Sequence, residues 1–584
     1  MQGNWTRERK KSLADRIEEL LLGTNTLFAT MSDSELEELA QKAYKKIKEK
    51  REVDLPAEPK KQPKNSSETK NKTDFERIDL NSMESEDVRE IGAEWLCYQT
   101  LEELKLGQFL ENLGWEPIWV NRAMIHIISK GVYPVSEHKT EQWIRENSGI
   151  SSLFSMESEK ISRHHLYEVS RRLYSIKEEL ESFLSKKTNE LFDLEDKIIL
   201  YDLTNTYFEG RKENSDLAAY GRSKEKRSDC KLLSLALVSN AEGFIKYSKI
   251  YKGNIGECKT LEQTVDYLSE STLKNTREVF NKPLVVMDAG ISSEENLKML
   301  KEKGYDYLCV TRSKLKDYEV LEDSKPLILT DNRNNPIEVK IIKKEGNSDN
   351  FLYVKSSQKA AKESSMRTRL ELKFEERLRT LNEGLKKKGG VKKEEKILER
   401  IEKLKVRHRK VSKNYSIDLQ SDAGVGKELI YTKNSVETEA IEGVYFLRTS
   451  KTDLGKADFW KIYNTLTEIE ATFRVLKTDL NLRPVYHQKD LNSEAHIFLG
   501  ILAYSMVSTI RFRLKQVGIR DDWSNIVRKM NTQKLVTNSM MNDKGEKIVM
   551  RFCSVPRLFV KKIYDTMKYK YLPFYKRKFV LPEK

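Results

Sequence analysis

Three acidic residues in this 584-residue chain have the types and positions that a two-metal phosphodiester site requires: Asp202, Asp288 and Glu470. Asp202 follows the apolar run 197–201 and Asp288 follows the apolar run 283–287, so each acid is expected where a strand ends. If the two strands are neighbours in one sheet, the carboxylates converge at one edge, and they repel each other unless a cation lies between them. Carboxylates that hold two divalent metals about 4 Å apart carry out the cutting or joining of phosphodiesters.

Glu470 is expected on a helix over residues 456–480, separate from the strands. The residues that share one face of this helix, at spacings of three and four, are Tyr463, Leu466, Glu470, Phe473 and Lys477. An acid among apolar neighbours is costly unless it is paired or liganded. Lys477 lies about 10 Å farther along the same face by helical rise, which suits an acid on a metal and a cation on a nearby phosphate. Each acid also has a structural explanation: an aspartate after a strand commonly opens a turn, and Glu470 has Arg474 one helical turn away.

The apolar pattern predicts an α/β fold in which two parts of a mixed-sheet core are separated by an insert. The predicted regions are a helical arm with a flexible linker over 1–74, a helical DNA-binding region over 75–190, the first part of the core over 191–312, a β-rich insert with a helical hairpin over 313–455, the second part of the core over 456–515, and a mixed C-terminal region, a candidate for dimerisation, over 516–584.

Within the core, the predicted order is strand, hairpin, helix, strand, helix, strand. The strands are expected over 197–207, 231–238, 244–251, 284–287 and 307–310. A capping box formed by Ser292 and Glu295 is expected to start the helix between the last two strands. Inside the insert, residues 357–412 are highly charged and helical, with a break at Gly389-Gly390.

Composition indicates a polyanionic partner. The net charge is +15 and the pI is about 9.1, which favours nucleic acid, although a lysine-rich surface that serves only solubility has the same charge. Five scattered cysteines without a C-x-x-C motif, together with only seven histidines, argue against a structural zinc site and suit a reducing cytoplasm. Residues 1–7 lack an apolar signal core, and the longest largely apolar stretch, 497–507, is too short to span a bilayer. We therefore expect a soluble intracellular protein with no membrane partner.

The acidic residues and their neighbours resemble the catalytic signature of DDE insertion-sequence transposases. Tyr463, Glu470 and Lys477 reproduce three members of the Y-x2-R-x3-E-x6-K pattern of that family. The segments that resemble its other blocks are 201–204, 251–254 and 287–290, and those that resemble one subgroup are 469–477 and 482–487. The resemblance covers about residues 75–570.

One position departs from the family pattern. The signature arginine falls at Leu466, and the candidates to supply its positive charge are Arg474 and Arg483. The assignment of the three acids does not depend on this position, whereas the phosphate contacts do.

The resemblance implies an RNase H-like core in which Asp202, Asp288 and Glu470 bind two Mg²⁺ or Mn²⁺ ions per active site. In the implied reaction, an activated water cuts the transposon end and the freed 3′-hydroxyl attacks target DNA. The implied DNA-binding residues are Tyr463, Arg474, Lys477, Arg483 and His487. The implied partners are double-stranded DNA, as terminal inverted repeats and as target, bound by a homodimer in the cytoplasm at the nucleoid.

Other functions are compatible with the same residues. One alternative is a metal-dependent nuclease of the same fold without strand transfer, and another is a non-catalytic DNA-binding or scaffold protein, although the intact acids argue against it. Inserts of this family help to handle a flipped base, often with a tryptophan, and residues 313–449 contain none. Phe351, Tyr353 and Tyr431 are candidates for that stacking role, but core packing explains these side chains equally well.

Overall fold

The computed structural model describes residues 41–42, 75–275, 282–315, 317–320, 325–331, 334–434, 442–574 and 577–581. The predicted arm and linker over 1–74 lie outside the described residues except at 41–42, which are helical. The chain divides into two units, Met1–Glu76 and Arg77–Lys584, and the second unit contains all three predicted acids.

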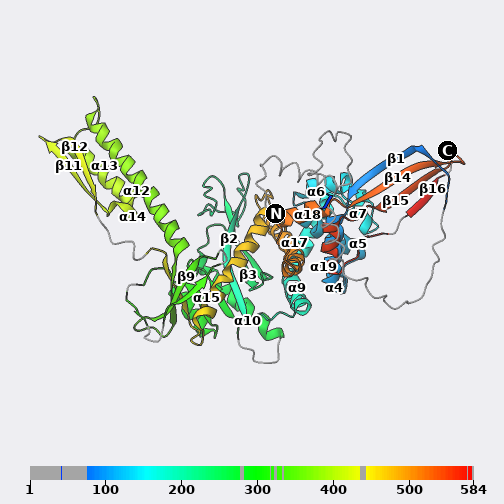
Figure 1. Cartoon of the computed structure of the whole chain (residues 1–584), viewed down its shortest axis with the longest axis horizontal. Coiled ribbons are helices and arrows are strands. Elements are labelled where there is room, and N and C mark those ends of the chain that lie inside the picture. The colour runs from blue at the N-terminus through cyan, green and yellow to red at the C-terminus, as the bar shows by residue number, and fades with distance from the viewer. Residues whose placement is uncertain are drawn as a thin grey trace. The chain divides into compact units, whose positions relative to one another are not determined.

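A ten-stranded sheet forms the core of the second unit (Figure 1). Its first five strands, in spatial order, are β4 (Ile245–Lys252), β3 (Leu232–Asn240), β2 (Ile198–Tyr207), β5 (Leu284–Met287) and β6 (Tyr307–Val310). The pairs β4–β3 and β3–β2 are antiparallel, whereas β5 runs parallel to β2 and β6 runs parallel to β5. This is the mixed sheet, with the order of elements, that the sequence pattern predicts.

Five described strands of the insert region continue this sheet, whereas β11 (Tyr415–Asp422) and β12 (Val425–Lys433) form a separate two-stranded sheet. Beyond β6 come β13 (Val444–Thr449), β10 (Asn350–Ser356), β9 (Pro336–Lys343) and β7 (Glu319–Val320), with β8 (Leu327–Thr330) also paired to β9. The pairing of β13 with β6 is antiparallel. Without it, β6 would be an open edge with unpaired backbone groups, which favours the continuation. Local sequence patterns indicate these strands but not their partners.

Residues 357–433 form a smaller substructure, which we call the insert arm. Its elements are α12 (Ser357–Lys386), α13 (Glu394–Arg407), α14 (Arg409–Ser412), β11 (Tyr415–Asp422) and β12 (Val425–Lys433), and they lie side by side (Figure 1). They enclose an apolar cluster of their own that includes Phe374, Leu378 and Ile401. Gly389, between α12 and α13, has a φ of +83°, a left-handed conformation that glycine adopts without strain. The predicted helical hairpin and its break at the glycine pair are therefore confirmed.

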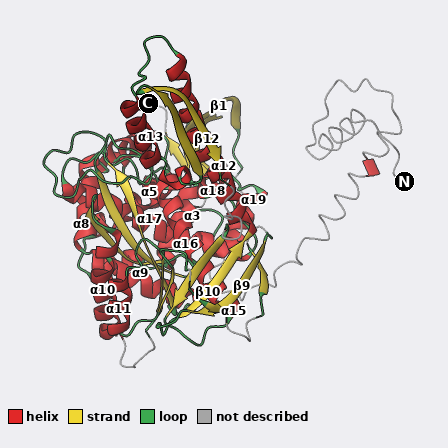
Figure 2. Cartoon of the chain, turned by 90° about the vertical axis from the view of Figure 1, so that its left-hand side faces the viewer, coloured by secondary structure: helices red, strands yellow, loops and turns green. Residues whose placement is uncertain are grey.

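Helices cover both faces of the core sheet (Figure 2). Alternate residues along each strand point to opposite faces. One face, which includes Leu200 and Val286, packs against α9 (Lys177–Phe192), α16 (Leu466–Arg474) and α17 (Asp490–Gln516). The other face, which includes Tyr201 and Met287, packs against α10 (Leu261–Asn275) and α11 (Glu294–Glu302). The N-cap of α11 is Ser293, whose hydroxyl accepts from Asn296 N at 3.2 Å, one residue later than the predicted Ser292.

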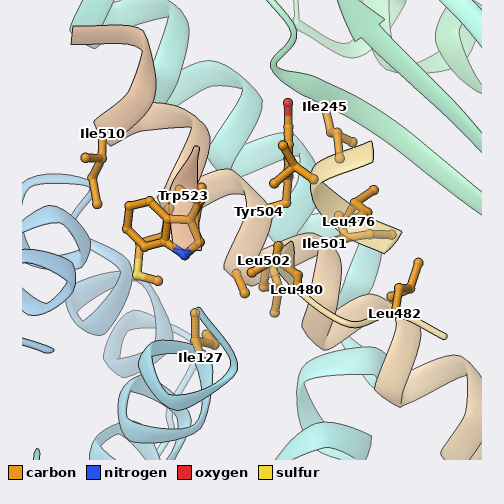
Figure 3. Close-up of a cluster of buried hydrophobic side chains, with 14 of the residues drawn as sticks. Ile127, Ile245, Leu476, Leu480, Leu482, Ile501, Leu502, Tyr504, Ile510 and Trp523 are labelled. Carbon is orange, nitrogen blue, oxygen red and sulfur yellow. The ribbon is translucent and has the colours of Figure 1, made fainter. Parts of the chain in front are cut away.

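The long helix α17 is buried at the centre of the unit. It is long and apolar enough to cross a membrane by length and composition, unlike the shorter stretch expected from sequence. Its neighbours are α3 (Gly92–Glu103), α5 (Pro117–Val132), α8 (Arg163–Ser175) and α19 (Leu558–Met567). Figure 3 shows Ile501, Leu502 and Tyr504 of this helix among apolar side chains such as Leu480 and Ile127. This burial is that of a core helix in a folded domain.

The region 75–190 is not entirely helical, contrary to the prediction. It begins with β1 (Ile78–Glu90), and its further helices are α4 (Leu106–Asn112), α6 (Glu137–Glu146) and α7 (Ile150–Leu153). β1 pairs antiparallel with β14 (Lys534–Asn542), in a four-stranded sheet completed by β15 (Lys547–Cys553) and β16 (Arg577–Leu581). Because the partner of β1 comes from the other end of the chain, local periodicity carries no signal for this strand. Helix α18 (Trp523–Met530) precedes β14.

Candidate active site

Asp202 and Asp288 lie next to each other on adjacent strands. The parallel register pairs Tyr201 of β2 with Met287 of β5, so the two acids are the next residues at the same level. Asp202 lies in the middle of β2, not at its end as predicted, whereas β5 does end just before Asp288. By strand alternation, Asp202 shares the sheet face of Leu200, which is the face that α16 covers.

The electrostatics of Asp202 reflect this crowding of acids. Burial raises the pKa of Asp202 to about 6; the positive charge of Lys224 opposes the rise, and the charges of Asp288 and Glu257 add to it. Asp202 Oδ1 also accepts a hydrogen bond from Leu203 N at 2.7 Å. A partly buried carboxylate whose acidic neighbours disfavour its ionised form is a group that a cation would stabilise.

Glu470 lies on α16, but the helix around it is not the straight one that the sequence predicts. Residues 456–480 form three segments: α15 (Lys456–Asn464), α16, and the π-helical turn η4 (Val475–Asp479). At the first break, the Thr465 hydroxyl and backbone N–H both donate to Ile462 O, at 2.6 and 3.1 Å. The breaks separate Tyr463 on α15 and Lys477 on η4 from α16. Within α16 itself Phe473 is buried, and Glu470 is exposed instead of lying among apolar residues as predicted.

Tyr463 connects the third acid to the two on the strands. The pKa of Tyr463 is raised to about 12, mainly by burial and also by the negative charges of Asp288 and Glu470, so both acids lie within electrostatic reach of its hydroxyl. Among the described residues, the one group of three His, Cys, Asp or Glu side chains with ligand atoms within 4.8 Å of one another lies elsewhere. The three acids are therefore brought to one region, and a bound cation would have to draw their oxygens closer.

The structure adds two charged residues that the sequence did not indicate, Lys224 and Glu257. Lys224 Nζ lies 4.0 Å from Asp202 Oδ1 and 3.8 Å from Glu257 Oε1. Gly290 allows the close approach of Glu257, because a Cβ at residue 290 would lie 2.2 Å from Glu257 Oε2. Asn205 of β2 positions Lys224 by accepting from its backbone N–H at 3.2 Å. Neither residue belongs to a local pattern that distinguishes it from other surface charges.

Two of the predicted DNA-binding cations meet at one acid near this site. Lys477 Nζ lies 3.4 Å from Glu225 Oε1, and the Arg483 guanidinium pairs with the same oxygen. The pKa of Lys477 is lowered to about 8, mainly by burial and also by the positive charge of Lys224, whereas the charge of Asp202 opposes the change. Lys477 is therefore a neighbour of the acid site, and Arg483 is joined to it through Glu225.

Arg474 and His487 lie in other surroundings. Arg474 is exposed on α16, one helical turn after Glu470, and its positive charge opposes the rise that burial causes in the pKa of Asp479. Of the two candidates for the missing signature arginine, Arg483 is the one that shares an acid with Lys477. His487 Nε2 lies 3.7 Å from Glu137 Oε1, and its ring contacts Tyr167 edge-on, so this histidine belongs to a different cluster.

Packing accounts for the aromatic residues considered for base stacking. Phe351 is buried with Ile342 and Phe446, and Tyr353 packs against the same cluster. Tyr431 packs against the apolar cluster of the insert arm. The stacking role predicted for Phe351 is not available to a side chain that is 2% exposed.

Comparison with known proteins is consistent with this geometry. A family model described as "Transposase DDE domain" matches residues 193–506, more than half of the chain, and the match contains Asp202, Asp288 and Glu470. Similar solved structures include "Mos1 transposase paired-end complex with left transposon end", at 8% identity, 51% of this chain, 77% of that chain and a TM-score of 0.15. Another is "Crystal structure of a pre-cleavage Mos1 transpososome", at 10% identity, 52% of this chain, 78% of that chain and a TM-score of 0.15. Such TM-scores are too low to support an argument, and no curated protein matches.

Proposed function

Because this chain belongs to the family of proteins with a transposase DDE domain, we propose that it cuts DNA at the ends of a mobile element and joins the freed ends to target DNA. The observation that carries the proposal is the placement of Asp202 and Asp288 at one level of two parallel strands. Helix α16, with Glu470, packs on β2 at the same sheet face. These three acids are the residues to which we assign the reaction.

The donor set at this site fits hard divalent cations. Carboxylate oxygens are the ligands that Mg²⁺ and Mn²⁺ prefer, and Asp202, Asp288 and Glu470 supply them, with Glu257 as a fourth acid close by. Two such ions, when bound, would stabilise the attacking and leaving oxygens of the phosphodiester. Transposases of the DDE type use divalent metals, and two ions per site is our proposal for this chain.

The surrounding side chains would position the DNA and balance the charge of the acids. Lys224 offsets the charge of Asp202 and Glu257, so we assign it the role of a counter-charge that a metal would replace. Glu225 holds Lys477 and Arg483 together, and a DNA phosphate would take its place as their shared partner. The charges of Asp288 and Glu470 both act on Tyr463, and this tyrosine would orient Glu470.

The proposed partners are the terminal inverted repeats and the target DNA, bound by two copies of the chain. The net charge of +15 supports a polyanionic partner. The insert arm, 357–433, contributes strongly to this charge, because it contains 22 lysines and arginines against 12 aspartates and glutamates, a net charge of +10. We propose that the arm contacts DNA phosphates.

A strand-transfer assay tests the proposal. The full chain is incubated with Mg²⁺, target DNA and a precut DNA end taken from the inverted repeats that flank its reading frame. We expect joined products from the wild-type chain, none from Asp288→Asn, and unchanged DNA binding in that variant. Asp216→Asn, at an exposed aspartate outside the site, is the matched control and should remain active.

Two outcomes of this assay would contradict the proposal. Cleavage of an uncut end without joined products would identify a nuclease of the same fold. Equal product from Asp288→Asn and the wild-type chain would show that the three acids do not carry the reaction.

A further inference from the structure

A second cluster of potential metal ligands lies away from the three acids. It consists of Glu137 at the start of α6, His487 in the segment before α17, and His496 within α17. One ligand atom of each lies within 4.8 Å of the others. Glu137 Oε1 is 3.7 Å from His487 Nε2 and 3.6 Å from His496 Nδ1. These separations are too long for hydrogen bonds and close to the roughly 3.4 Å that separates two ligand atoms of a tetrahedral zinc ion.

Several polar atoms of this cluster are buried without a partner. Among the described residues, Glu137 Oε2, His496 Nδ1 and the neighbouring His126 Nδ1 have no hydrogen bond. Leaving such atoms unsatisfied costs about 1–3 kcal/mol each, so a native structure normally supplies a partner. A cavity of about 280 Å³ is lined by Glu137, His487 and His496, and it provides room for an ion and a path to it.

We propose that Glu137, His487 and His496 bind one divalent transition metal of the zinc class, with solvent from the cavity as a further ligand. Two imidazoles and one carboxylate favour Zn²⁺ or Co²⁺, whereas the carboxylate site favours Mg²⁺ or Mn²⁺. A structural zinc site is not expected from the sequence, because the sequence has no local motif of zinc ligands. The ligands of this site are far apart in the chain, so only folding assembles them.

The competing explanation is that the buried ammonium of Lys130, which lines the same cavity, is the partner of Glu137. Burial lowers the pKa of Lys130 to about 8, and Glu137 opposes that change. Within the part of the chain that is described, however, the basic side chains with a nitrogen within 4.0 Å of a Glu137 carboxylate oxygen are His487 and His496.

A metal bound at this site would crosslink three segments of the fold. Helix α6, helix α17 and the residues between η4 and α17 each contribute one ligand. The last segment also carries Arg483 and forms a parallel bridge between Val485 and Phe208, just beyond β2. A metal here would therefore stabilise the path of the chain that brings Arg483 to Glu225.

Cobalt binding tests this proposal without relying on DNA cleavage. The full chain, stripped with a chelator, is titrated with Co²⁺ while its visible d–d absorption is recorded, with a chromophoric chelator as competitor. Asp288→Asn is titrated in parallel to weaken the carboxylate site. We expect one equivalent with tetrahedral absorption in both proteins, resistant to excess Mg²⁺. The affinity should fall by more than about tenfold in His487→Gln and His496→Gln. His138→Gln, at the exposed histidine next to Glu137, is the matched control and should bind like the wild-type chain.

Other results would overturn the proposal. The first is an absence of the cobalt spectrum in the wild-type chain. The second is a cobalt affinity in both His487→Gln and His496→Gln that equals that of the wild-type chain. The third is a loss of cobalt binding in His138→Gln. Far-UV circular dichroism checks folding, and if His496→Gln does not fold, His487→Gln decides, because its side chain lies at the more open position, 11% exposed. Lys130→Met adds an independent test: removal of the nearby positive charge should leave cobalt binding unchanged or tighter, and weaker binding by the folded variant would contradict the proposed site.

Discussion

Asp202 and Asp288 stand at the same level of adjacent parallel strands, because Tyr201 pairs with Met287 and each acid is the next residue. This register places two like charges together in a partly buried site, where Lys224 Nζ, 4.0 Å from Asp202 Oδ1, offsets them. The arrangement costs stability when no cation is bound and creates affinity for one. The same relationship thus explains both a raised pKa and a proposed metal site.

Asp202→Asn should stabilise the metal-free protein at pH 8. The rise of the Asp202 pKa from 3.8 to about 6 means that this group favours folding below pH 3.8 and that this contribution is lost as the pH rises through 6. Asparagine does not ionise, so the variant does not lose stability in this way as the pH rises. We therefore expect a gain in the free energy of unfolding on the order of 1–3 kcal/mol at pH 8 in a urea titration with EDTA, and a smaller gain at pH 5.

The same variant should lose its response to metal. Addition of Mg²⁺ should raise the melting temperature of the wild-type chain but not that of Asp202→Asn, because a ligand that binds the folded state stabilises it. Asp216→Asn is the control, since this exposed aspartate is not placed at the site. A metal-free Asp202→Asn that is less stable than the wild-type chain at pH 8 would contradict this account of the site.

Arg483, and not Arg474, should be needed for DNA cleavage. Arg483→Ala removes a cation that shares Glu225 with Lys477, and we expect the rate of end cleavage to fall by at least about tenfold. Arg474→Ala alters an exposed side chain, and we expect a change of less than about twofold. Single-turnover cleavage of a labelled transposon end measures both. The reverse order of effects would assign the signature arginine to residue 474.

DNA binding should weaken as the pH rises through 8. The pKa of Lys477 is lowered to about 8, so its ammonium loses its proton above that pH and with it the attraction for phosphate. We expect affinity, measured by fluorescence anisotropy at constant salt, to fall several-fold between pH 7 and pH 9. Lys477→Arg should flatten the profile because arginine stays charged. Lys489→Arg, at an exposed lysine nearby, should keep the wild-type profile; a profile unchanged by Lys477→Arg would exclude Lys477 as its cause.

Neutralising the exposed lysines of the insert arm should reduce the salt dependence of DNA binding. Lys387, Lys388 and Lys393 are exposed at the turn between α12 and α13. Their replacement by glutamine should lower the slope of log affinity against log salt by about 2–3, since each phosphate contact contributes roughly 0.9. The matched triple arginine variant keeps the charge and should retain the slope. An unchanged slope in the glutamine variant would show that this end of the arm does not contact DNA.

Short apolar runs placed the central strands correctly from sequence alone. The strands β5 and β6 occupy residues 284–287 and 307–310, as predicted, and the helical hairpin breaks at Gly389. These features depend on local properties: apolar side chains must be buried, and glycine adopts a left-handed backbone conformation without strain. The adjacency of Asp202 and Asp288 also followed, because a mixed sheet of this order brings the two parallel strands together.

Tertiary structure alone decided the features that depend on distant partners. Nothing local predicts that β1 pairs with β14, that β13 extends the core sheet, or that Thr465 interrupts the helix before Glu470. The same holds for the approach of Lys224 to Asp202, for the pairing of Arg483 with Glu225, and for the meeting of Glu137 with His487 and His496. The sequence by itself determined which acids were available for the chemistry. Packing between segments far apart in the chain determined which charges surround those acids, because electrostatic neighbours are set by distance in space and not along the chain.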